Sequence, residues 1–129
     1  MTMHGVGARR RVLVSDDDPL LRWALGRQLA ERGLETIEAE SVRETLEHEA
    51  EADLVLLDLR LPDGDGLAAA RSLLALRPDR PLLLMTSFAT PELVAEAVRT
   101  GVRRCIDKSF EVDEMARIVE ESLLARQRT

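Results

Sequence analysis

The sequence predicts an α/β fold built on one five-stranded parallel sheet. Five short apolar runs alternate with longer stretches of helical periodicity, some of these runs are almost purely aliphatic, and turn residues separate the units. Such alternation is typical of parallel sheets, whose inner strands are buried on both faces. The chain has 129 residues, which is enough for a single domain with its own core.

The first units carry clear helix-start signals. Residues 11–15 predict a strand, and Asp16-Asp-Asp-Pro19 predicts a helix start, because an acidic cap and an early proline both favour one. Leucines at fourfold spacing continue that helix to Gly33, a residue type that commonly ends helices. An alternating run at 34–39 predicts an edge strand, and Ser41-Val-Arg-Glu44 is a capping box that starts the second helix.

The middle of the chain contains the most apolar runs. Residues 54–58 are nearly all aliphatic and predict a central strand, and the turn at 62–66 opens a third helix. Residues 82–86 predict a fourth buried strand. A cap, a first-turn proline and an acid at 90–92 then start a fourth helix, which ends at Gly101.

The last unit completes the predicted domain. Residues 102–107 predict a half-polar fifth strand, and an apolar stripe predicts a final helix through Val112, Met115, Val119 and Leu123. We expect residues 1–10 to be a flexible N-terminal extension and residues 11–126 to form the domain.

Composition limits the kind of protein and its partners. The chain has 18 Lys plus Arg against 24 Asp plus Glu, a net charge of −6, which disfavours nucleic acid or an anionic membrane as a direct partner. No signal-peptide pattern or membrane-length apolar run is present, and Cys105 is the only cysteine, so we expect a cytoplasmic protein without disulfides. Lys108 is the only lysine.

Polar residues follow four of the predicted strands: Asp16 and Asp17, Asp58, Thr86, and Lys108. Ligands of open parallel sheets bind at the carboxyl ends of the strands, so these side chains should converge. Carboxylates forced together need a cation, and hard oxygen ligands suit Mg²⁺. The cation would recruit a phosphoryl oxygen, the ammonium and hydroxyl would support it, and one carboxylate could be the nucleophile.

Each of these residues also has an ordinary explanation. An aspartate after a strand is often a helix cap, a strand-end threonine is often only hydrogen-bonded, and a loop lysine is usually solvated. Asp58 is poorly placed as a cap, since the third helix starts near Asp65. The joint occurrence of all five at the ends of four different strands, in the right order, favours the functional interpretation.

Four segments then resemble the receiver domain of two-component response regulators, over about residues 11–124. Residues 12–19 resemble its acidic pocket, Asp58-Leu-Arg-Leu-Pro62 its phosphoacceptor segment, residues 85–87 its switch hydroxyl segment and residues 107–110 its lysine loop. The stretch 16–23 resembles regulators of the nitrogen-regulation type.

The resemblance implies a doubly wound, flavodoxin-like fold with strand order 2-1-3-4-5 and five helices. Asp58 would accept a phosphoryl group from a sensor histidine kinase, a phosphotransfer protein or acetyl phosphate, so the domain would phosphorylate and dephosphorylate itself without being a turnover enzyme. An output surface at about 90–124 would contact an unknown output protein or domain. Charged side chains on that surface would also allow a homodimer: Arg99, Arg103, Arg104, Glu114 and Arg117.

The resemblance also assigns roles within the pocket. Asp17 would bind Mg²⁺ directly and Asp16 largely through water, with Asp58 and the backbone carbonyl of Arg60 completing the protein ligands. Lys108 would pair with the phosphate. Thr86 would swing toward the phosphate, in a switch region that also includes Ser87, Phe88 and Cys105.

Two positions depart from the family pattern. The family lysine is normally followed by a cis proline, whereas Ser109 follows Lys108. A cis peptide bond costs about 2.5–4 kcal/mol before a non-proline residue, against about 0.5–1 kcal/mol before proline. We therefore expect a trans bond before Ser109, a shifted loop and a displaced Lys108 ammonium. Cys105 stands where many receivers have an aromatic switch residue. The readout would then run through backbone shifts of the fourth helix or through Phe88.

Arg60 and Phe88 lie at positions that flank the attacking water in this family, so we expect slow hydrolysis and a long-lived phosphoprotein. The main alternative is a degenerate receiver that binds a protein partner independently of phosphorylation. A phosphohydrolase with an aspartate nucleophile would need a second Asp where Arg60 stands. A nucleotide-binding domain is disfavoured because Gly5-Val-Gly7 precedes the first strand.

Overall fold

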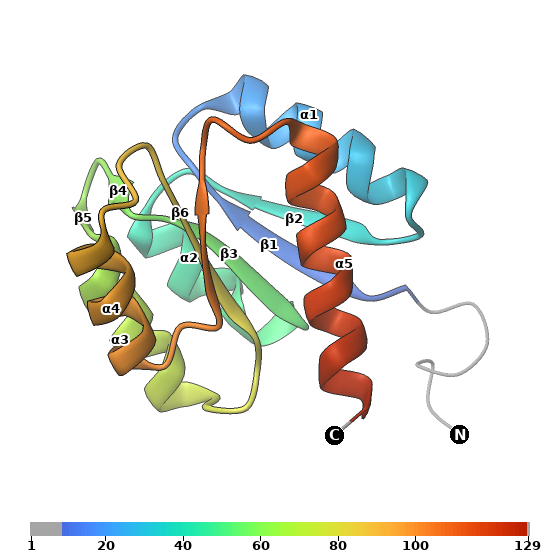
Figure 1. The fold of residues 1–129 in the computed structure, drawn as a ribbon. Helices are drawn as coiled ribbons and strands as arrows, with labels where there is room; N and C mark the ends of the chain where they lie inside the picture. The colour runs from blue at the N-terminus through green and yellow to red at the C-terminus, as the bar shows by residue number, and fades with distance from the viewer. Residues whose placement is uncertain (1–8, 129) are drawn as a thin grey trace.

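A computed structural model describes residues 9–128 of the chain (Figure 1). The sheet is formed by β1 (Arg11–Ser15), β2 (Glu35–Ala39), β3 (Leu54–Asp58), β6 (Leu82–Thr86) and β7 (Arg104–Asp107). The helices are α1 (Pro19–Glu31), α2 (Val42–His48), α3 (Gly66–Leu76), α4 (Pro91–Thr100) and α5 (Val112–Arg128). Residues 1–8 of the expected N-terminal extension lie outside the described residues.

The five strands are parallel and follow the order β2-β1-β3-β6-β7. Counted along the chain, this is the expected order 2-1-3-4-5, with β2 at one edge. Every residue of β3 and β6 is buried, as expected for inner strands that are covered on both faces.

Helices cover both faces of the sheet and divide the core in two (Figure 1). Alternate strand residues such as Val14 and Leu56 pack with α1 and α5, where Leu25, Leu29 and Val119 are fully buried. The intervening strand residues pack with α2, α3 and α4 in a second core cluster. The period-two alternation of a strand therefore supplies both layers of the core.

The expected helix caps form. Asp18 accepts a hydrogen bond from the Leu20 amide (3.0 Å) at the start of α1, and Thr90 accepts one from Leu93 (3.2 Å) at the start of α4. Ser41 accepts the Glu44 amide at the start of α2, but the Glu44 carboxylate accepts from the Glu40 amide instead of closing the box on Ser41. Of the helices within residues 9–128, none has the length and apolar composition to cross a bilayer.

Three local features differ from the sequence expectations. The turn at 62–66 belongs to a small antiparallel ribbon of β4 (Arg60–Leu61) and β5 (Gly64–Asp65). A 3₁₀ turn, Glu49–Glu51, follows α2. The fifth strand begins at Arg104 and not at residue 102, because the Val102 amide donates to the Ala97 carbonyl (3.0 Å) and completes the end of α4.

Candidate functional site

Three carboxylates and the lysine meet at the carboxyl edge of the sheet. Asp16, Asp17 and Asp58 each offer an oxygen within 4.8 Å of the others. The Lys108 Nζ atom lies 2.8 Å from Asp16 Oδ2 and 3.1 Å from Asp58 Oδ2. Residues that follow three different strands therefore meet at one edge of the sheet, as expected for a parallel sheet.

The backbone of the loop after β1 presents one buried and one exposed carboxylate. The Asp16 side chain is fully buried, and its Oδ1 accepts a hydrogen bond from the Asp18 amide (2.9 Å). The Asp16 amide donates to the Ala39 carbonyl (3.0 Å) of β2. Asp17 is exposed, so it faces the solvent from which a cation would arrive.

Asp58 ends the central strand and is almost completely buried. Burial raises the pKa of its carboxyl group, and the nearby charge of Asp16 raises it further; the Arg60 amide, which donates to Asp58 Oδ1 (3.1 Å), and Lys108 oppose this shift. One oxygen is therefore held by the backbone and the other by the ammonium.

A close backbone approach sets the loop after Asp58. The Gly66 amide donates to the Leu59 carbonyl (2.7 Å), and a Cβ on Gly66 would lie 2.5 Å from the Leu59 Cα. Only glycine fits at this point, since backbone atoms cannot yield as a flexible side chain can.

The lysine loop is anchored to the neighbouring strand. The Lys108 amide donates to the Thr86 carbonyl (2.8 Å), and the Ser109 amide donates to Asp107 Oδ1 (2.9 Å). No peptide bond among the described residues is cis, so the expected trans bond before Ser109 is confirmed. The Lys108 ammonium reaches both carboxylates from this anchored backbone, and a shift of the loop and ammonium relative to other receivers stays a prediction.

The charge of Lys108 is well supported in this pocket. Burial tends to lower its pKa, but hydrogen bonds and attraction from Asp16 and Asp58 outweigh this and raise the pKa above its usual value. Lys108 therefore stays positively charged beside the carboxylates at neutral pH.

A pocket of about 200 Å³ opens beside these groups. Its lining residues are Asp17, Asp58, Arg60, Thr86, Ser87, Phe88 and Lys108. The Thr86 hydroxyl oxygen accepts a hydrogen bond from the Phe88 amide (3.1 Å), and the Phe88 ring is 69% exposed. Cys105 is not one of the lining residues: it is half-buried in β7, and burial raises its pKa.

The donor set fits Mg²⁺. Three carboxylates supply hard oxygen atoms close together, one of them facing solvent, which suits a cation that keeps part of its water shell. Without a cation the carboxylates repel one another, and Lys108 is the positive group between two of them.

Two contacts around the acidic pocket had no signal in the sequence. Arg22 of α1 donates from Nη1 to the Asp16 carbonyl (2.6 Å) and from Nε to Glu38 (2.7 Å). Asp63, in the turn of the β4–β5 ribbon, accepts from the first two amides of α2 at 2.7 and 3.1 Å. Glu38 is distant in sequence from Arg22, and the two α2 amides are distant from Asp63, whereas the Asp16 carbonyl lies six residues before Arg22.

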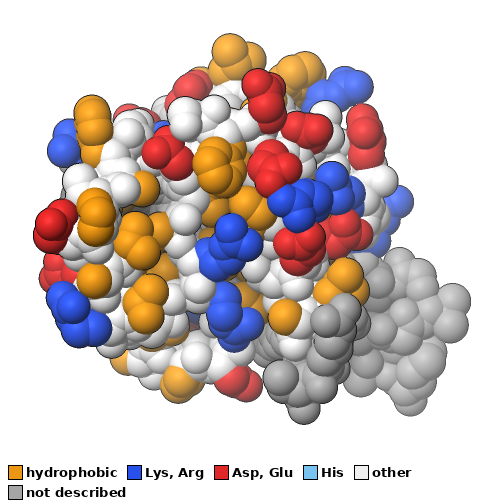
Figure 2. All heavy atoms as spheres, viewed as in Figure 1, with side chains coloured by type: hydrophobic (Ala, Val, Ile, Leu, Met, Phe, Trp, Pro, Cys, Tyr) orange, Lys and Arg blue, Asp and Glu red, His pale blue; other side chains and the backbone are white. Residues whose placement is uncertain are grey.

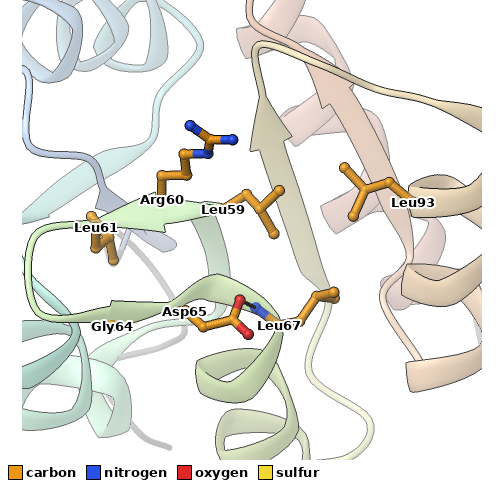
Figure 3. A pocket seen from close by; sticks show the side chains of 7 residues that line it. All are labelled: Leu59, Arg60, Leu61, Gly64, Asp65, Leu67 and Leu93. Atoms are coloured by element: carbon orange, nitrogen blue, oxygen red, sulfur yellow. Dashed lines mark hydrogen bonds between the residues drawn. The ribbon is translucent and has the colours of Figure 1, made fainter.

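An apolar pocket of about 430 Å³ lies behind the ribbon, toward α4 (Figure 3). Figure 3 shows Leu59, Leu67 and Leu93 extending into it, while the Arg60 guanidinium points away from them. Asp65 caps α3 by accepting from the Leu67 amide (3.0 Å). Arg60 of the ribbon lines both this apolar pocket and the polar pocket beside Asp58.

A doubly wound parallel sheet that presents a triad of aspartates, a threonine and a lysine at its carboxyl edge defines the class of phosphoacceptor receivers. Comparison with protein families agrees, because the family described as "Response regulator receiver domain" matches residues 12–120. The chain belongs to this family and is a receiver domain of two-component response regulators.

Individual relatives agree with this assignment. The chain is 35% identical over 118 residues to Regulatory protein AtoC and 34% identical over 114 residues to DNA-binding transcriptional regulator NtrC, both of Escherichia coli (strain K12). These matches cover 90% and 87% of this chain but 26% and 24% of the relatives. The chain therefore spans about a quarter of their length.

Solved structures show the same fold. A CheY-like receiver domain protein from Methanospirillum hungatei JF-1 superposes with a TM-score of 0.86 at 24% identity, over 94% of this chain and 98% of that one. The non-phosphorylated HemR receiver domain from Leptospira biflexa superposes with a TM-score of 0.83 at 28% identity, over 89% and 94% of the two chains.

Proposed function

We propose that Asp58 is the phosphoacceptor of this receiver domain, and that it takes its phosphoryl group in a Mg²⁺-dependent reaction. The observation that supports this most directly is the ammonium of Lys108, which contacts Asp16 and Asp58 beside an open pocket lined by Thr86. The pocket offers a nucleophile, a positive charge and a hydroxyl within one small space.

The side chains have separate tasks in the transfer. A carboxylate oxygen of Asp58 attacks phosphorus, and the bond from phosphorus to the donor breaks, so the product is an aspartyl phosphate. The Arg60 amide holds Oδ1 of Asp58, which orients the carboxylate. Lys108 exchanges part of its contact with Asp58 for the phosphoryl oxygens and stabilises their charge.

Asp16, Asp17, Asp58 and the backbone carbonyl of Arg60 would hold the cation. When bound, Mg²⁺ supplies positive charge that offsets the carboxylates and attracts the phosphoryl oxygens. Asp16 is buried and fixed by the Asp18 amide, while exposed Asp17 remains free to approach a cation from solvent.

Thr86 is suited to sense the phosphate. Its hydroxyl oxygen already accepts the Phe88 amide, which leaves its proton available for a phosphoryl oxygen. A movement of Thr86 would pull on Phe88 directly and on the Lys108 backbone through the Thr86 carbonyl. The signal would pass along the loop through Ser87 to α4, with Cys105 of β7 as a packing neighbour and not as a rotating aromatic.

The output surface would comprise α4, β7 and α5. Figure 2 shows basic and acidic side chains intermingled over α5, with hydrophobic ones on the α4 side of the same face. A sensor histidine kinase or phosphotransfer protein would act as donor, and an output protein or domain, or a second copy, would bind this surface. We propose that residues 11–126 form the unit, that it acts in the cytoplasm, and that it does not contact nucleic acid itself.

Intact-mass analysis tests this proposal. The protein is incubated with acetyl phosphate, with and without Mg²⁺, and the same is done with Asp58→Asn. We expect one phosphoryl group on the unsubstituted protein only when Mg²⁺ is present, and none on Asp58→Asn. No adduct under any condition, with a partner still bound, would favour the alternative of a phosphorylation-independent binding module.

A further inference from the structure

Arg22 ties α1 to the loop that carries two of the three pocket carboxylates. Its guanidinium donates to the Asp16 carbonyl over 2.6 Å, the shortest of the contacts that fix this loop, and its side chain is only 12% exposed. The same guanidinium donates to Glu38 of β2 over 2.7 Å. Two charge-assisted contacts therefore hold one planar group in a single orientation.

The peptide between Asp16 and Asp17 depends on this contact. The Asp16 amide is bound to Ala39, so Arg22 fixes the other end of the same residue. The carbonyl that Arg22 binds belongs to the peptide plane that also contains the Asp17 amide. Fixing the carbonyl therefore fixes the direction in which the chain enters Asp17.

Asp17 has no other restraint on its carboxylate. Within the described residues its side chain is exposed and accepts no hydrogen bond, in contrast to Asp16 and Asp58. The Asp17 backbone therefore sets the range of positions, close to the other two carboxylates, that its unrestrained carboxylate can reach. A side chain that holds this backbone controls whether the three oxygens stay close enough for one cation.

We propose that Arg22, held by Glu38, is a positioning residue for the cation site. It touches neither the pocket nor the phosphoryl group; it acts through the Asp16 carbonyl on the placement of Asp17. This inference rests on the proposed role of the carboxylates as Mg²⁺ ligands.

Mg²⁺ titration followed by amide NMR spectra tests it, with urea unfolding of each protein measured in parallel. Arg22→Gln should weaken Mg²⁺ binding by about tenfold, the usual effect of losing a group that orients a metal ligand. Glu38→Gln should weaken it less, because the carbonyl contact remains. Phosphorylation is not needed for this readout.

Two controls separate positioning from general stability. Leu21→Ala removes a partly buried side chain next to Arg22 and should lower the urea midpoint, with Mg²⁺ affinity kept within about twofold. Arg43→Gln removes an exposed arginine that pairs with Glu47 and should change neither measurement.

The outcomes are distinguishable. Mg²⁺ affinity of Arg22→Gln within about twofold of the unsubstituted protein, or an equal loss in Leu21→Ala, would overturn the inference and leave the proposed function intact. If Arg22→Gln does not fold, unchanged affinity in Glu38→Gln overturns it. If the unsubstituted protein and Asp17→Asn both fail to bind Mg²⁺, the proposed function falls and the inference with it.

Discussion

Replacing Lys108 by methionine should destabilise the metal-free protein strongly. The substitution keeps most of the side-chain volume but removes the only lysine ammonium of the chain. Asp16 and Asp58 are both buried, and their oxygens lie 2.8 and 3.1 Å from the Lys108 Nζ atom. Without the ammonium, the two carboxylates would face each other with no cationic partner. The pKa of Asp58, already raised by burial, should rise further, so that this carboxyl takes up a proton more readily.

The magnitude follows from the burial of the pair. Removing one partner of a buried ion pair costs about 3–5 kcal/mol. The Lys108 side chain is 21% exposed and Asp58 can relieve part of the cost by protonation, so we expect the lower end, about 3 kcal/mol. Arg43→Met is the matched control: its pair with Glu47 is 2.9 Å long but largely exposed, and its loss should cost less than about 0.5 kcal/mol.

Urea unfolding followed by circular dichroism, with and without Mg²⁺, measures both effects. Mg²⁺ at about 100 times its dissociation constant adds about 2.7 kcal/mol to a protein that binds it only when folded. At a fixed Mg²⁺ concentration, the increase in the free energy of unfolding should be larger for Lys108→Met, because the cation no longer competes with the ammonium. Equal costs for the Lys108 and Arg43 variants, or an equal gain from Mg²⁺ with and without Lys108, would refute the reasoning.

Three further predictions concern the loops around the pocket. Gly66→Ala should unfold the loop after β3 or the whole domain, because the new Cβ meets the Leu59 backbone at 2.5 Å; a urea midpoint equal to that of the unsubstituted protein would contradict this. Asp63→Asn should lower stability at neutral pH. Hydrogen bonds from two amides of α2 lower the pKa of Asp63 from 3.8, so its contribution to the folding free energy is present above pH 3.8 and is lost as the pH falls through the lowered pKa. The urea midpoints of Asp63→Asn and the unsubstituted protein should therefore converge in acid. Arg60→Ala with Phe88→Ala should shorten the lifetime of the phosphoprotein, as followed by intact mass after the donor is removed, and an unchanged lifetime would show that these two side chains do not shield the phosphate.

The sequence predicted the sheet well because its strands are apolar and bounded by turn residues. The bounds expected for residues 11–15, 54–58 and 82–86 are those of β1, β3 and β6. The start of β7 was wrong by two residues, since the Val102 amide ends α4 instead of joining the sheet. The β4–β5 ribbon was missed because strands of two residues carry no periodicity.

The pocket residues could be predicted because strand ends meet at one edge of a parallel sheet. The residues that hold the loops could not. Arg22 contacts a side chain 16 residues away, and Asp63 contacts amides 20 and 21 residues away. Backbone amides are the same in every residue, and a carboxylate on another strand has no fixed spacing from its arginine, so these partners leave no pattern in the sequence.

The residue that carries the phosphoryl group can be identified directly. After treatment with acetyl phosphate and Mg²⁺, reduction with borohydride converts an acyl phosphate on aspartate to homoserine, and peptide mass analysis locates it. We expect homoserine at position 58 alone. Homoserine at Asp16 or Asp17, or at no position in a protein that binds Mg²⁺, would contradict the assignment of Asp58 as the phosphoacceptor.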